Sequence, residues 1–334
     1  MPVLMSDVAT RAQVSVTTVS HVLNGTRVVA ASTRQRVLAA IDDLKYYKNA
    51  PARLLARGRS DSLGLIISDI ENPFFPELIK SFERACLEKH LEVILCTTNY
   101  DSRQAQSAVR RMIEAKVRGV AVMTSQLDAE RIAELAASDT PVALLDAPPA
   151  RRGRGNVKID YTRGAREAIG HLRGLGHREI AIVSGPRERI SATAYEERLR
   201  RAAAELGISI ARVIEGNNRP EGGAAGVKEL LAKGILPGAI VCGNDQMAFG
   251  AMSAVFEAGM RVPEDVSIVG ADDIAFARFS HPPLTTVRIP RDELGRVAFE
   301  SLERMIHNKR RTGVERVVAA QLVIRQSTGA ARKI

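Results

Sequence analysis

Residues 14–25, VSVTTVSHVLNG, predict a short helix with one apolar side and one uncharged polar side. Ser15 can accept a hydrogen bond from the first helical turn, and Gly25 favours a helix end, so the helix should run over residues 16–24. The apolar side carries Val19, Val22 and Leu23, and the outward side carries Thr17, Thr18, Ser20, His21 and Asn24. Such an outward side can donate and accept hydrogen bonds on an external partner.

The sequence around this segment predicts two further helices. One should begin near Ser6 as its cap and end before Gln13, and the other should cover residues 32–45 with Ser32 at its start. The residues between Gln13 and Ser15 are enough only for a tight turn. Two short helices joined by a turn and braced by a third form a helix-turn-helix unit, whose second helix enters the DNA major groove.

The net charge of +10 is concentrated near the N-terminus. Residues 1–60 contain nine Lys and Arg against three Asp, a net charge of +6, whereas the rest contains 39 basic and 35 acidic residues. A basic head on a nearly neutral body indicates a polyanionic partner at the head. Charge alone leaves open the alternative of a basic surface that is merely solvated.

Three scattered cysteines, Cys86, Cys96 and Cys242, show no CxxC or Cys/His grouping. This favours reduced thiols in a cytoplasmic protein and gives no reason to expect a metal site or a cofactor. The N-terminal segment has no signal-peptide pattern, and no apolar run reaches the length of a membrane span.

From residue 63 onward, apolar runs alternate with amphipathic segments. The first series places strands at LGLIIS, LEVILC, GVAVM and VALLD, with helices over 76–89, 102–116 and 128–138. The second series places strands at EIAIVSG, ARVIEG, AIVCG and VSIVGAD, with helices over 191–206, 221–233 and 245–258. This alternation predicts two α/β lobes with parallel sheets and a ligand cleft at the carboxyl ends of the strands.

Polar and aromatic side chains follow four of these strands: Asn72, Phe74 and Phe75; Asp146; Asn244 and Asp245; Asp272 and Asp273. Carboxylates and amides can bracket hydroxyl groups, and a Phe ring can pack on the C–H face of a sugar ring, so the cleft suits a polyhydroxylated small molecule. Structural roles are the alternative for two of them, because Asp245 could cap helix 245–258 and Phe75 could belong to the core.

The stretch DVATRAQVSVTTVSHVLNGTRVVAASTRQRVLAAIDDLKY, residues 7–46, resembles the DNA-binding head of the lactose-repressor (LacI/GalR) family of bacterial transcription regulators, and the resemblance continues to residue 57. The resemblance implies that Val16, Thr17 and His21 read base edges, while Ser15, Thr18, Ser20, Asn24 and Arg27 mostly hold phosphates. It also places a hinge helix in the linker 49–60, with Leu55 inserted into the minor groove. Gln13 stands at a turn position that is often Gly in the family, where a left-handed backbone brings modest strain.

The body resembles the family's periplasmic-sugar-binding-protein-like core through SLGLIISDIENPFFPELIKSFERAC, LGHREIAIVSGP, GNDQMAFGAM, VPEDVSIVGADDI and PPLTTVR. Carried over by position, the effector pocket includes Phe74, Phe75, Asp146, Arg189, Asn244 and Asp272, and Asn72 adjoins it. Tyr195 stands where the family usually has an arginine, and Asn218 stands where it usually has an aromatic residue. Arg189 could compensate for the lost guanidinium or could bind an acidic ligand, and both alternatives stay open.

The family resemblance implies a repressor that binds a near-palindromic operator as a homodimer and responds to a small molecule, sugar-like in character, in the cleft. We expect a helix-turn-helix domain over 1–48, a linker over 49–60 and an effector-binding and dimerisation body over 61–334. Within the body, lobe 1 should comprise about 61–160 and 291–320, and lobe 2 about 161–290 and 321–334. The sequence identifies neither the effector nor the direction of its control.

Two other classes of protein share parts of this pattern. A sugar-binding transport protein has a similar body, but it needs a signal peptide and lacks a DNA-binding head. An α/β enzyme is the weaker alternative, because GxSxG, HExxH, P-loop and CxxC motifs are absent from the sequence. The run GGAAG at 222–226 should loosen a helix start, and His177 should be structural because it follows the helix-ending Gly176.

Overall fold

The computed structural model of the chain describes residues 3–46, 59–124, 127–147, 149–235, 237–308 and 310–332. The chain divides into two compact units, Met1–Ser60 and Asp61–Ile334, called here the head and the body. Each unit has its own hydrophobic core. Leu55, for which the family resemblance implies a contact with DNA, lies outside the described residues.

The head contains three helices, α1 (Met5–Ala12), α2 (Val16–Asn24) and α3 (Ala31–Asp43). They pack around a small core formed by Val8, Ala9, Ala12, Val19, Val22, Val37, Ala40 and Tyr46. The bounds predicted for α2 are confirmed, with Ser15 Oγ accepting a hydrogen bond from the Thr18 N–H and Gly25 in the left-handed region. The head therefore has the predicted helix-turn-helix arrangement.

The predicted cap of the first helix is wrong, although the helix starts close to the predicted position. Helix α1 begins at Met5 with Leu4 as its N-cap in place of Ser6, and the Asp7 carboxylate accepts a hydrogen bond from the Leu4 N–H. Helix α3 begins at Ala31, one residue before Ser32, and its N-cap residue makes no side-chain hydrogen bond. The turn prediction is confirmed, since Gln13 has φ 53° and ψ 50°.

Lobe 1 of the body is built on a six-stranded parallel sheet in the order β11-β5-β4-β3-β1-β2. Its strands are β1 (Ser62–Ile67), β2 (Glu92–Thr97), β3 (Val120–Met123), β4 (Val142–Leu145), β5 (Arg154–Asp160) and β11 (Glu315–Ala319). Its helices are α5 (Phe74–Glu88), α6 (Ser102–Glu114), α7 (Ala129–Ala137) and α12 (Arg291–His307). Because the strands are parallel, their carboxyl ends meet at one edge of the lobe.

Lobe 2 has a second six-stranded sheet in the order β12-β10-β9-β8-β6-β7, parallel except for the β10–β12 pair. Its strands are β6 (Glu179–Ser184), β7 (Ser209–Glu215), β8 (Ala239–Cys242), β9 (Ser267–Asp272), β10 (Thr285–Arg288) and β12 (Gln321–Val323). Its helices are α8 (Thr162–Gly174), α9 (Ile190–Leu206), α10 (Pro220–Ala232), α11 (Asp245–Glu257) and the short 3-10 helix η1 (Ala275–Arg278). The predicted α/β architecture with parallel sheets is confirmed.

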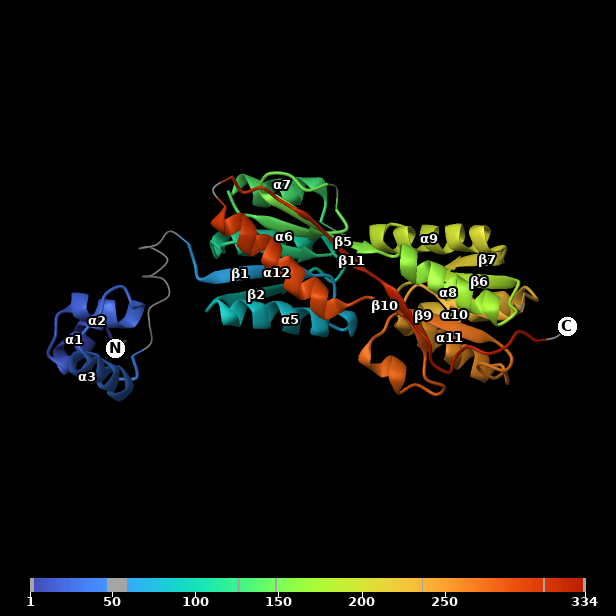
Figure 1. The fold of residues 1–334 in the computed structure, drawn as a ribbon, viewed down its shortest axis with the longest axis horizontal. Helices are drawn as coiled ribbons and strands as arrows, with labels where there is room; N and C mark the ends of the chain where they lie inside the picture. Colours follow the sequence, from blue (N-terminus) through green and yellow to red (C-terminus); the bar gives the residue numbers. More distant parts are fainter. Residues whose placement is uncertain are drawn as a thin grey trace. The chain divides into compact units, whose positions relative to one another are not determined.

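The chain crosses between the lobes at three places, after β5, after β10 and after β11 (Figure 1). The crossing residues Tyr161, Ile289 and Ala320 are buried. The first and third crossings lie side by side, since the Ala320 N–H donates to the Asp160 carbonyl oxygen. Helix α12 and strand β11, which the alternation of apolar runs did not reveal, therefore return from lobe 2 to complete lobe 1.

The glycines of GGAAG lie in the first turns of helix α10, where they let it approach α11 closely. A Cβ atom at Gly223 would overlap the Met247 carbonyl oxygen, and one at Gly250 would overlap the Pro220 carbonyl oxygen. Only a residue without a side chain permits this backbone separation.

Candidate functional site

The outward side of α2 presents most of the residues that the sequence assigned to DNA contact. Ser15, Val16, Thr17 and Arg27 are exposed, and Thr18, Ser20 and His21 are half-buried. The Nδ1 atom of His21 lies 2.8 Å from Thr26 Oγ1, which fixes the orientation of the imidazole ring. Asn24 ends the helix, and its side chain lies outside the described part of the structure.

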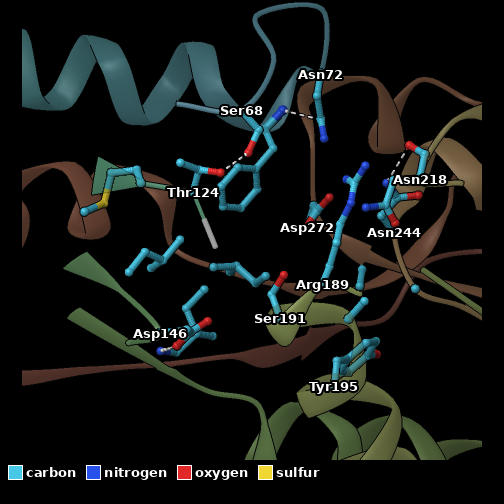
Figure 2. A pocket seen from close by; sticks show the side chains of 18 of the residues that line it. Ser68, Asn72, Thr124, Asp146, Arg189, Ser191, Tyr195, Asn218, Asn244 and Asp272 are labelled. Carbon is cyan, nitrogen blue, oxygen red and sulfur yellow. Dashed lines mark hydrogen bonds between the residues drawn. The ribbon is translucent and has the colours of Figure 1, made fainter. Parts of the chain in front are cut away.

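A cavity of about 850 Å³, open solvent included, lies between the two lobes at the carboxyl ends of their strands. All nine residues proposed from the sequence line it: Asn72, Phe74, Phe75, Asp146, Arg189, Tyr195, Asn218, Asn244 and Asp272. Figure 2 shows Asp146 on one side of the cavity and Arg189, Asn244 and Asp272 on another.

The aromatic wall of the cavity comes from the start of α5. The Asn72 Oδ1 atom accepts a hydrogen bond from the Phe74 N–H, so the Asn72 amide nitrogen stays available to a ligand. Phe74 and Phe75 are buried and meet edge to face, with ring centroids 5.2 Å apart. Phe75 thus lines the cavity and also belongs to the core, so its two alternative roles coexist.

Asp146 follows β4 and has one engaged and one unengaged carboxylate oxygen. Its Oδ1 atom accepts a hydrogen bond from the Ile159 N–H at 2.8 Å, while its buried Oδ2 atom has no partner among the described residues. Burial raises the pKa of Asp146 to about 6, against the opposing effects of the Ile159 hydrogen bond and the Lys158 charge. Oδ2 is therefore a buried acceptor that a ligand hydroxyl could satisfy.

Asp272 ends β9 in a strained backbone conformation, with φ 108°. Burial and the nearby charge of Asp245 raise the pKa of Asp272 well above its usual range, whereas Arg291 lowers it. Arg291 is itself buried and donates to the Asp272 carbonyl oxygen and to Glu77 of lobe 1. Strain and burial at one residue are typical of a functional position.

The alternative role considered for Asp245, as the cap of helix α11, is wrong. Asn244 is the N-cap, with Oδ1 accepting from the Met247 N–H at 2.8 Å and Nδ2 donating to the Asn218 carbonyl oxygen at 2.9 Å. Asp245 points inward instead and accepts hydrogen bonds from the Ile274 N–H and the Thr286 hydroxyl. Asn244 therefore lines the cavity chiefly as a structural residue, and Asp245 positions the β9 end next to Asp272.

Arg189 and Tyr195 introduce two unsatisfied polar atoms into the cavity wall. The Arg189 guanidinium stacks on the Tyr100 ring with its Cζ 3.6 Å from the ring centroid, and its buried Nε has no hydrogen-bond partner in the described residues. The Tyr195 hydroxyl is likewise buried and unpartnered, while its ring packs against Tyr161 at a centroid distance of 5.4 Å. Together with Asp146 Oδ2, these are three buried polar atoms of cavity-lining residues that have no hydrogen-bond partner among the described residues.

Sequence reasoning missed several residues of the cavity, of which Tyr100 is the most informative. Tyr100 follows β2 with φ 60° and reaches Arg189 of lobe 2. Arg219 makes a second bridge between the lobes, with ion pairs of 3.1 Å to Asp69 and 3.2 Å to Glu71. A strand-end position was the available signal for Tyr100, but strand ends alone do not reveal partners across a cleft.

His177 is structural, as its position after Gly176 suggested. The ring is buried, and its Nε2 atom lies 3.1 Å from both Ser267 Oγ and the Gly329 carbonyl oxygen. Within the described residues, no group of three or more His, Cys, Asp or Glu side chains could hold a metal ion. Among the same residues, no helix is both long and apolar enough to cross a membrane.

We expect Asp146→Asn to remove a pH-dependent loss of stability from the ligand-free protein. The pKa of Asp146 is about 6 in the folded protein and 3.8 in its ordinary, unfolded environment, so the folded protein binds the carboxyl proton more tightly. The free energy of unfolding of the wild type therefore falls as the pH rises from about 4 to about 6. The neutral amide should stabilise the protein at pH 8 by up to about 3 kcal/mol, with no gain below pH 4. Urea unfolding across this pH range measures the difference. Parallel stability curves for the two proteins contradict the assignment, and Glu264→Gln, at an exposed acid of lobe 2, is the control.

Two family models match the chain. Residues 4–49 match bacterial regulatory proteins of the lacI family, and residues 169–328 match a periplasmic binding protein-like domain. The chain is 36% identical over 310 residues to the HTH-type transcriptional repressor PurR of Glaesserella parasuis serovar 5 (strain SH0165), with 91% of each chain covered.

Solved structures are similar over nearly the whole chain. The lac repressor dimer bound to operator and the anti-inducer ONPF has a TM-score of 0.89 and 29% identity, with 99% of this chain and 100% of that chain covered. The complex of the transcriptional regulator CelR with cellobiose has a TM-score of 0.74 and 27% identity, with 97% and 99% covered. These relatives are transcriptional regulators that join a DNA-binding head to a ligand-binding body.

Proposed function

The chain belongs to the lacI family of bacterial regulatory proteins, and from that premise we propose how its two units act together. It is a DNA-binding transcriptional repressor with a body that binds a small-molecule effector. We propose that it works in the cytoplasm as a homodimer on a near-palindromic operator. Residues 1–48 bind DNA, residues 49–60 link, and residues 61–334 bind the effector and dimerise, divided into the two lobes expected from the sequence.

In the head, α2 lies in the major groove and its N-terminal half reads the bases. Thr17 and His21 make hydrogen bonds with base edges, and Val16 contacts a thymine methyl group. The supporting observation is the exposure of Val16 and Thr17 beside the oriented His21 ring. The remaining contacts position the helix on phosphates, through Ser15, Thr18, Ser20, Asn24 and Arg27, while Leu55 inserts into the minor groove.

In the body, the effector is a small polar molecule, either a sugar or a sugar derivative. The observation that carries this proposal is the set of three buried and unpartnered polar atoms, Asp146 Oδ2, Arg189 Nε and Tyr195 Oη, around one cavity with aromatic walls. Hydroxyl groups satisfy both a carboxylate and a phenol, and ring C–H faces pack on Phe74 and Phe75. The cellobiose in the CelR complex supports the same ligand class.

The two units are coupled through closure of the cleft. Contacts that join the lobes across its mouth, Arg189 with Tyr100 and Arg219 with Asp69 and Glu71, favour a closed arrangement. An effector that binds between the lobes changes the free energy of closure, and it thereby changes the affinity for operator DNA by the same coupling free energy.

The base-reading assignment is tested with the double substitution Thr17→Ala and His21→Ala. Because each missing base-edge contact removes about 1–3 kcal/mol of discrimination, loss of both contacts should weaken operator affinity by at least about 30-fold, with a smaller loss on random duplex. Fluorescence anisotropy with both duplexes gives the ratio. Equal losses of affinity on the two duplexes would contradict base reading. The control is Thr10→Ala on α1, because the Thr10 hydroxyl donates to the Ser6 carbonyl oxygen within its own helix.

The effector class is tested by a thermal-shift screen of sugars, sugar acids, phosphosugars and nucleobases. A ligand at about 100 times its Kd should stabilise the protein by about 2.7 kcal/mol. A neutral sugar that raises the unfolding temperature supports the proposal, and a response confined to nucleobases contradicts it. A response confined to sugar acids would assign the anionic group to Arg189.

A further inference from the structure

The body carries a concentration of arginines at the edge of lobe 1 opposite the effector cavity. They come from the loop before β5, the first residue of β5 and the loop before β11. We call the group the arginine rim: Arg151, Arg152, Arg154, Arg310 and Arg311. A backbone hydrogen bond joins the two loops, with the Gly153 N–H donating to the Arg311 carbonyl oxygen at 2.8 Å. The arginines therefore form one surface.

The positive charge of the rim is poorly compensated within the body. Asp139 pairs with Arg311, and Glu315 accepts a hydrogen bond from Asn156. Arg151, Arg152 and Arg310 are exposed and have no ion pair among the described residues. Arg154 is half-buried with an unpartnered Nε, and its pKa is lowered first by burial and then by the charge of Arg151. Clustered like charges repel one another, and a bound polyanion would remove that repulsion.

The rim lies at the edge of the sheet where the chain enters the body from the head. The register aligns Gly64 of β1 with Val120, Val142 and Arg154 on successive parallel strands, so three strand spacings, about 14 Å, separate β1 from the rim strand β5. All strands of lobe 1 start at this edge (Figure 1). Arg118, half-buried, lies at the entry point, where its N–H donates to the Ser62 carbonyl oxygen at 2.9 Å.

We propose that the arginine rim is a second DNA-contacting surface, which binds backbone phosphates of the duplex held by the head. The proposal rests on the DNA-binding function of the head. The linker 49–60 has twelve residues and a contour length of at most about 40 Å, and it joins the head to the edge of the sheet that carries the rim. Guanidinium groups bind phosphate oxygens through charge-assisted hydrogen bonds, and such contacts add affinity without reading sequence.

The experiment uses the full-length triple variant Arg151→Ala, Arg152→Ala and Arg310→Ala with a 40-bp duplex selected from random sequence by the wild-type protein. Affinity is measured by fluorescence anisotropy from 50 to 300 mM KCl. We expect at least a ten-fold weaker Kd at 100 mM KCl, and a salt slope reduced by about 0.9 for each phosphate that the variant no longer neutralises. The ratio of operator to random-duplex affinity should stay unchanged, unlike that of the Thr17/His21 double variant.

Two controls keep the test decisive. The triple lysine variant at the same positions keeps the charge and should retain most of the affinity. Arg173→Ala, Arg178→Ala and Arg212→Ala remove the same charge from exposed positions of lobe 2 and should leave the slope unchanged. A rim variant with the wild-type slope, or with the slope of the lobe 2 control, overturns the proposal. Absence of operator binding by the wild-type protein overturns both this proposal and the proposed function.

Discussion

Removal of residues 1–60 is expected to abolish operator binding and leave effector binding intact. The head has its own core, with Val8, Val19 and Val37 fully buried, and it carries +6 of the net charge of +10. Specific complexes of this type are about 10³–10⁷ times tighter than non-specific ones, so the expected loss of operator affinity is at least about 1,000-fold. Gel retardation on the selected duplex measures it, and calorimetry with the effector tests the remaining body.

The same truncation separates the contributions of the two DNA-contacting surfaces. The body keeps the arginine rim, so weak binding that does not depend on sequence should remain at low salt and vanish near physiological ionic strength. Retention of operator preference by the truncated body would contradict the assignment of base reading to α2. Equal effector affinity in the full and truncated proteins, measured without DNA, is the matched control for correct folding of the body.

Asp272→Ala is expected to eliminate the effector response while operator binding persists. Asp272 lines the cavity at the end of β9, and its side chain is held in place by the strained backbone. Loss of a buried carboxyl group that bonds to the ligand costs about 2–3 kcal/mol, or roughly 30- to 150-fold in effector affinity. Titration calorimetry measures the effector Kd, and anisotropy measures operator affinity with and without effector.

A neighbouring acid provides the control for this substitution. Glu264 lies before the opposite end of β9 and is exposed, so Glu264→Ala removes a carboxylate from lobe 2 without touching the cavity. Its effector affinity should equal that of the wild type. Unchanged effector affinity in Asp272→Ala would remove this residue from the site, and lost operator binding would indicate that the substitution unfolds the body.

Local rules were sufficient to predict much of the head and the strand-helix alternation of the body. Helix α2 has the expected bounds because a capping serine and a left-handed glycine enclose it, and both signals act within one turn. The cap of α1 was mispredicted because Leu4 is the N-cap in place of Ser6, with its N–H donating to the Asp7 carboxylate, and the start of α3 was missed by one residue. The residue that caps a helix depends on which nearby group forms a hydrogen bond with the free N–H groups of the first turn.

The cavity residues could be predicted because strand ends converge in parallel sheets, but their interactions could not. Tyr100 meets Arg189 only because the two lobes face each other, and nothing in the local sequence encodes that pairing. The exchange of roles between Asn244 and Asp245 depends on Thr286, which is distant in sequence. Likewise, Gly223 and Gly250 are explained by a backbone contact between two helices and not by helix propensity. The ligand-binding role of the cavity residues stays a prediction.

The three chain crossings between the lobes also govern the order in which the protein can fold during synthesis. Lobe 1 obtains Leu294, Ala298 and Leu302 of its core from α12, and its edge strand β11 begins only at Glu315. A ribosome must therefore complete nearly the whole polypeptide before lobe 1 can close its core, although the head is finished within the first 46 residues. The nascent body exposes the unfinished apolar face of lobe 1 throughout that interval, so chaperone dependence should be greatest late in translation.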